Sequence, residues 1–193
     1  MSNKKEIRSA ALIASIEHTK QTIEGYATVF NSETLLYSMS GIDFYETVDA
    51  GAFEGTELSN VVLWYNHSDN FSILARTSNN TLRLSIDETG LKIEADIAET
   101  TQGKDIYELI KRKDISKMSY GYIVEKDYIE KVAERKYVRH ISKIKKLIDV
   151  SVVDIPAYDG TNVDIMKRSF EFIEKEIALR KYIEIKSKIA QYI

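Results

Sequence analysis

Hydrophobic and polar positions alternate along much of the chain, and this period of two predicts β-strands. In LKIEADIA, residues 91–98, every second residue is apolar, which is typical of a strand with one buried face. Together with residues 82–87 and a turn at Glu88–Gly90, this segment predicts a β-hairpin. Further strands are predicted at 22–30, 41–48, 60–67 and 147–158, and a second hairpin over 120–130 and 136–141.

Two segments follow a helical period instead. In residues 100–113, Ile106, Leu109 and Ile110 recur at helical spacing, and Thr100 or Thr101 is a candidate N-cap. From about residue 164 the chain carries two apolar stripes separated by charged residues, which predicts one long C-terminal helix.

The predicted fold is mainly β with α. We expect an antiparallel barrel of six to eight strands, one internal helix and a long C-terminal helix, because many short strands at this spacing favour closure over a sandwich. The predicted parts are an N-terminal arm or first strand (1–21), a barrel domain (22–162) and a C-terminal helical extension (163–193).

Composition narrows the class of protein. The chain has 193 residues, which suits one domain with an appendage, and its net charge of −3 gives no basic footprint for nucleic acid. It has no cysteine, so disulfides and thiol catalysis are excluded. No apolar run has the length of a membrane span, and the apolar part of the N-terminal segment ends at Glu17 without a processing site. We expect no membrane partner and an intracellular protein.

Only three histidines are available as a general base. His18 lies in the N-terminal arm among charged and polar residues, which does not favour catalysis. His67 ends an apolar strand where the chain turns polar, so its ring could face a cleft or simply lie at the surface. Ser119, in KMSYGY, is either a nucleophile or a small structural residue before a strand.

Asp149 is the unusual acid, because its neighbours in LIDVSVV are apolar and a buried carboxylate needs a partner. An imidazole or an arginine would serve, and Arg76, Arg83 and Arg139 are all available. No cluster of histidine and acid has ligand spacing for a metal, and no phosphate-binding motif is present, so we expect neither metal nor cofactor.

Seven short motifs follow one another along the chain: GYATVF (25–30), AGAF (50–53), NH (66–67), TGL (89–91), GKDIYELI (103–110), MSYGY (118–122) and DVSVVDIPA (149–157). Taken in this order, they make the chain resemble the HK97-like prohead maturation proteases of tailed bacteriophages. The resemblance covers about residues 22–160 and implies a serine endopeptidase related in fold to herpesvirus assemblin.

The resemblance also implies roles for particular residues. Ser119 is the nucleophile, in the Met-Ser-x-Gly position, and His67 is the general base, in the Asn-His position. Asp149 occupies the position of an acid that is usually glutamate, and would orient His67. In the herpesvirus relatives the orienting residue is a second histidine, so His140 is the alternative third member.

The expected partners follow from the same resemblance. They are the major capsid protein with its scaffolding segment, and the chain itself through autoprocessing or as a homodimer. The expected location is the assembling procapsid in the host cytoplasm. A non-catalytic capsid scaffolding or interaction module on the same barrel is the alternative, and the distance between His67 and Ser119 discriminates between the two.

Overall fold

The computed structural model describes residues 5–17, 21–70 and 73–154, and six positions between 175 and 186. The chain divides into two compact units, residues 1–160 and residues 161–193. The strands of the first unit are β1 (Glu6–Glu17), β2 (Thr22–Val29), β3 (Thr34–Met39), β4 (Ile42–Val48), β5 (Val62–Tyr65), β6 (Ala75–Arg76), β7 (Leu82–Ile86), β8 (Gly90–Asp96), β9 (Lys117–Ala133) and β10 (Lys136–Val153). Its helices are the short 3₁₀ helix η1 (Thr77–Asn79) and α1 (Thr101–Lys111).

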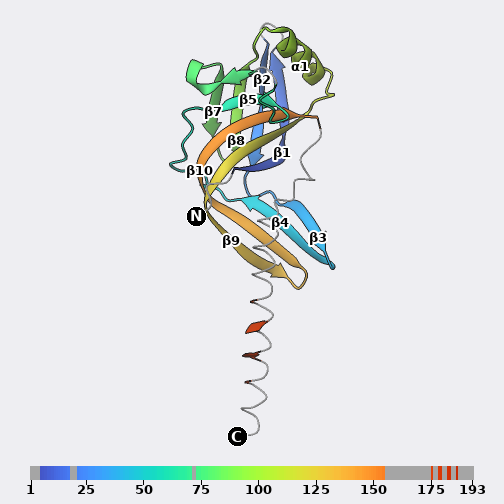
Figure 1. The fold of residues 1–193 in the computed structure, drawn as a ribbon, viewed down its shortest axis with the longest axis vertical. Helices are drawn as coiled ribbons and strands as arrows, with labels where there is room; N and C mark the ends of the chain where they lie inside the picture. The colour runs from blue at the N-terminus through green and yellow to red at the C-terminus, as the bar shows by residue number, and fades with distance from the viewer. Residues whose placement is uncertain are drawn as a thin grey trace. The chain divides into compact units, whose positions relative to one another are not determined.

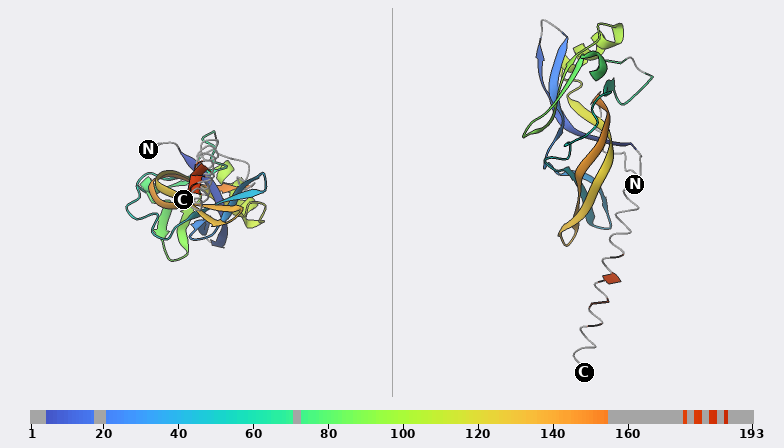
Figure 2. Two further views of the ribbon diagram at one scale, coloured as in Figure 1. Left: turned by 90° about the horizontal axis from the view of Figure 1, so that it is seen from below. Right: turned by 90° about the vertical axis from the view of Figure 1, so that its left-hand side faces the viewer.

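In the described residues, all ten strands belong to one sheet, whose main path runs β3-β4-β10-β9-β1-β2-β8-β7. Most neighbours are antiparallel, but β4 and β5 both pair in parallel with β10, at residues 136–141 and 149–152 respectively. The long hairpin of β9 and β10 (yellow and orange) runs from below α1 to the end of the unit where β3 and β4 lie (Figure 1). The right-hand view in Figure 2 shows its two strands side by side.

The predicted barrel is wrong. In the described residues the path ends at β3 on one side and at β7 on the other, and these two strands do not pair, so the sheet stays open. One physical reason is that β9 and β10 are single strands of 17 and 18 residues rather than several short ones. Repeated register shifts along this pair bend it without closing the sheet.

The predicted long C-terminal helix is also not found. No helix follows β10 among the described elements, and most of residues 163–193 lies outside the described residues. At the few positions described there, the side chains of Leu179, Tyr182 and Ile183 are exposed. The apolar period was too little to predict a long helix, because most of the stability of a helix comes from tertiary packing of its apolar face rather than from its own sequence.

Other predictions are confirmed. The hairpin of β7 and β8 forms as the alternation indicated, with Leu91, Ile93 and Ala95 fully buried. The helix α1 begins after Thr100, whose side chain accepts a hydrogen bond from the Gly103 N–H at 3.0 Å. The core lies between these elements and the apolar faces of β2, β9 and β10.

Candidate active site

The pairing of β9 with β10 gathers polar side chains on one face of the sheet. Ser119 lies opposite Ser151, and Gly121 lies opposite Asp149. Because side chains alternate along a strand, residues two apart share a face, so all four positions face the same side. Ser119, Asp149 and Ser151 are fully buried there.

His67 reaches this face from a tight turn after β5. Asn66 and His67 both have left-handed backbone angles, with φ of 51° and 53°, so β5 ends two residues earlier than the apolar pattern predicted. Two hydrogen bonds to β10 hold the turn: the Asn66 N–H donates to the Val152 carbonyl at 3.0 Å, and the His67 N–H donates to Ser151 Oγ at 3.1 Å.

Asp154 fixes the same turn from its outer side. Its carboxylate accepts hydrogen bonds from the Tyr65 hydroxyl at 2.8 Å and from Asn66 Nδ2 at 2.9 Å. The asparagine before His67 therefore anchors the turn, which gives the Asn-His pair in the sequence a structural explanation.

The structure brings together three residues singled out in the sequence. His67 Nε2 lies 2.6 Å from Ser119 Oγ, and His67 Nδ1 is hydrogen-bonded to Asp149 Oδ1. Both ring nitrogens are therefore occupied, and the imidazole is 11% exposed. The shorter aspartate spans the gap without the extra methylene of a glutamate.

His140 lies in a different environment. Its Nδ1 is 2.8 Å from Asp49 Oδ1, its Nε2 is 3.4 Å from Glu130, and its ring stacks on Tyr128. It pairs with Thr47 of β4, in the half of β10 away from Asp149. Of the two candidates for orienting His67, Asp149 is the one that contacts the ring. His18 lies outside the described residues.

The carboxylate of Asp149 is ionised at neutral pH. Burial alone raises its pKa, but the hydrogen bond with His67 and the nearby Lys5 ammonium outweigh burial and hold the pKa below its usual value. An anionic acid beside Nδ1 favours the tautomer that carries its proton there, which leaves Nε2 free to accept one from Ser119.

Ser119 has two acceptors for its single hydroxyl proton. Its Oγ lies 2.6 Å from His67 Nε2 and 2.5 Å from the backbone carbonyl oxygen of Arg8 on β1. Either the imidazole nitrogen or the Arg8 carbonyl oxygen can accept this proton, and only the first arrangement would activate a serine hydroxyl. Ser119 is also fully buried.

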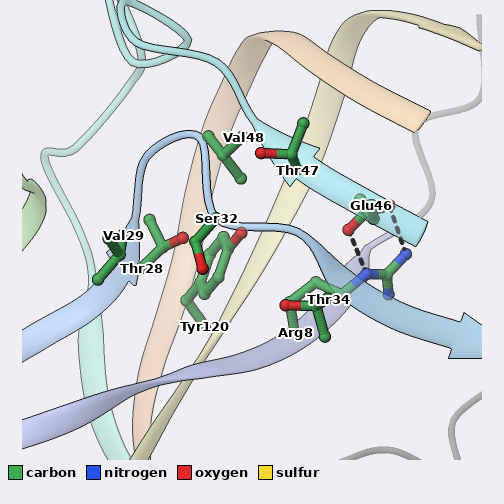
Figure 3. A pocket seen from close by; sticks show the side chains of 9 residues that line it. All are labelled: Arg8, Thr28, Val29, Ser32, Thr34, Glu46, Thr47, Val48 and Tyr120. Carbon is green, nitrogen blue, oxygen red and sulfur yellow. Dashed lines mark hydrogen bonds and ion pairs between the residues drawn. The ribbon is translucent and has the colours of Figure 1, made fainter. Parts of the chain in front are cut away.

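The opposite face of β9 carries a buried ionic cluster. Glu46 of β4 accepts hydrogen bonds from Arg8, from Arg139 at 2.8 Å and from the Tyr122 hydroxyl at 3.1 Å. Figure 3 shows Arg8 and Glu46 beside Tyr120 in a small pocket. Because Tyr120 follows Ser119 in the strand, this pocket lies on the far side of β9 from His67. The charged groups of the cluster around Glu46 pair with one another, which indicates a structural role.

Sequence reasoning missed Ser151 and Lys5 as neighbours of these residues. Ser151 stands in the DVSVV motif, where its alternation with Asp149 could have placed it on the same face. Lys5 gave no signal, because nothing in a basic N-terminal segment predicts that its chain pairs with β9. Within the described residues, no helix is long and apolar enough to cross a membrane.

Comparison with known proteins gives a family. No curated protein and no solved structure matches the chain. The family model described as caudovirus prohead serine protease matches residues 9–176, a range that includes His67, Ser119 and Asp149. Since this match spans well over half of the sequence, the chain belongs to the caudovirus prohead serine protease family.

Proposed function

We propose that this capsid maturation protease is an endopeptidase with Ser119 as nucleophile, His67 as general base and Asp149 as the residue that orients His67. The observation that carries the proposal is the continuous series of hydrogen bonds from Ser119 Oγ through both nitrogens of His67 to Asp149. A serine needs such a base, because its hydroxyl is a weak nucleophile at neutral pH.

The chemistry follows from where protons can move. The Ser119 hydroxyl gives its proton to His67 Nε2 as Oγ attacks the carbonyl carbon of a peptide bond. The imidazolium that forms is stabilised by the Asp149 carboxylate, and its Nε2 proton then passes to the leaving amine. Water, activated by the same nitrogen, releases the acyl group from Ser119 and restores the enzyme.

One change precedes attack. The Arg8 carbonyl is a second acceptor for the Ser119 proton, so the hydroxyl must direct this proton to His67, and the groups covering Oγ must move enough to admit a peptide bond. Buried nucleophiles of this kind become reactive only after their surroundings rearrange, which suits an enzyme that acts late in an assembly.

The proposed substrates are the scaffolding segment of the major capsid protein and the protease itself. The test is co-expression with the cognate capsid protein, in wild-type form and as Ser119→Ala. Wild type should yield shortened capsid protein on a gel, and the variant should yield none. Ser142→Ala is the matched control. Ser142 lies on β10, where its hydroxyl donates a hydrogen bond to the Lys126 carbonyl and does not contact His67.

The same experiment addresses a non-catalytic scaffolding module. In that case procapsids would assemble and the capsid protein would keep its full length with wild type and variant alike. The 2.6 Å contact between His67 and Ser119 argues against this alternative, because a protein without the chemistry has no need to hold the two in reach.

A further inference from the structure

The N-terminal segment contributes a charged side chain to the candidate active site. Lys5, directly before β1, extends its ammonium to Asp149 Oδ2, the carboxylate oxygen that does not contact His67. In the described residues Oδ2 has no hydrogen-bond donor of good geometry, so the Lys5 charge is what balances it. Asp149 thus lies between two cations once His67 is protonated.

The strand pairing explains how Lys5 gets there. Ile7 of β1 pairs with Gly121 of β9, and Lys5, two residues earlier, points to the same face. Its side chain crosses over Gly121, where no side chain blocks the path. Glu6 and Arg8 point to the other face and join the ionic cluster around Glu46.

A glycine is needed at position 121 because the Lys5 side chain passes over it, and not because of its backbone angles. A Cβ at this position would overlap Lys5 Cε and Asp149 Oδ2, and would lie 3.1 Å from Lys5 Nζ. Any larger residue would push Lys5 and Asp149 apart. The glycine two positions after Ser119 therefore has a role tied to both of them.

We propose that Lys5 is a positioning residue of this protease, which acts through Asp149 to keep the carboxylate aligned on His67. This inference rests on the proposed function. It goes beyond the family assignment, because Lys5 precedes residue 9, where the family match begins.

Electrostatics give Lys5 a measurable effect. Among the described residues, the charged or titratable groups that contact the carboxylate are His67, from the turn after β5, and Lys5, from before β1, while β9 places the uncharged Gly121 beside it. Lys5 shares the negative charge of Asp149 with His67. Without it, the full charge acts on the imidazole and favours the protonated ring. When the buffer is acidified, cleavage should therefore be lost already at a higher pH than in wild type.

The test compares Lys5→Met with wild type in procapsids moved to buffers spanning roughly pH 5 to 9. On the acid side of the pH–rate profile, the limb along which cleavage falls should move up by about one pH unit, as expected for loss of a cation beside a carboxylate. At a given pH on this acid limb the variant should cleave about tenfold more slowly than wild type, since each pH unit there is a factor of ten in unprotonated base. Lys5→Arg should restore the wild-type limb.

Lys92→Met is the matched control. Lys92 is also about one-third exposed and forms an ion pair, with Glu24, away from the site. It should leave the limb unchanged. Melting curves check that the variants are folded, and Lys5→Gln makes the same comparison with a smaller change in polarity.

The outcomes separate the two proposals. Cleavage by Ser119→Ala, or none by wild type, would overturn the proposed function. Cleavage by wild type together with an unshifted acid limb in folded Lys5→Met or Lys5→Gln would overturn the role of Lys5 alone.

Discussion

Ser119 and Ser151 lie directly opposite each other on β9 and β10, and they contact the side chain and the backbone of His67, respectively. Ser119 Oγ contacts the ring at Nε2, while Ser151 Oγ accepts the backbone N–H of the same residue at 3.1 Å. The register between these two strands therefore positions both the proposed nucleophile and the residue that holds the backbone of its base.

Ser151→Ala should lower kcat about tenfold with little change in KM, because Ser151 contacts the backbone of His67 and a small displacement of a base is costly. The unpaired N–H should also lower the free energy of unfolding by about 1 kcal/mol. Cleavage kinetics and urea denaturation measure the two effects. Ser151→Thr keeps the hydroxyl, so a loss as large as that of alanine would contradict this role.

His67→Ala should reduce cleavage by about 10²- to 10⁴-fold, the usual contribution of a general base. His140→Ala is the control, because His140 pairs with Asp49 and stacks on Tyr128 rather than contacting Ser119. Processing of the capsid protein over time measures both. Equal losses in the two variants would argue that His67 has no special role.

Asp149→Asn should lower kcat by about 10³- to 10⁴-fold, because a neutral amide can donate to His67 Nδ1 and so favour the tautomer with its proton on Nε2. In that tautomer Nε2 cannot accept the Ser119 proton. Asp87→Asn, in the exposed turn between β7 and β8, should cleave at the wild-type rate. A near-normal rate in Asp149→Asn would remove this residue from the mechanism.

The lowered pKa of Asp149 also predicts a pH dependence of stability. A carboxyl whose pKa is lower in the folded than in the unfolded chain stabilises the fold above its unfolded value of 3.8. This contribution disappears as the pH falls below 3.8 and through the folded pKa. The Tm difference between wild type and Asp149→Asn should therefore shrink over that range, and a difference that is constant with pH would contradict the assignment.

Glu46→Gln should destabilise the fold by about 3 kcal/mol, because it leaves the buried Arg8 and Arg139 with too little negative charge. Burial raises the pKa of Glu46, but these two arginines hold it below its usual value. Urea denaturation measures the loss. Glu57→Gln removes an exposed partner of Lys146 and should have no measurable effect. Equal effects of the two changes on the free energy of unfolding would contradict a stabilising role of the ionic cluster around Glu46.

Some features of this protein follow from its sequence alone. Alternation in residues 91–97 determined the hairpin of β7 and β8, and helical spacing with Thr100 determined α1, because both depend on neighbours within a few residues. The resemblance of its motifs to those of the prohead proteases singled out His67, Ser119 and Asp149. In the structure His67 contacts both of the others.

Other features were decided only by the tertiary structure. Whether the sheet closes depends on which distant strands pair, and β3 and β7 do not. The choice of Asp149 over His140 at the His67 ring depends on which half of β10 lies beside β5. Lys5 reaches Asp149 because β1 pairs with β9 across more than a hundred residues, and such long-range register leaves no local pattern in the sequence.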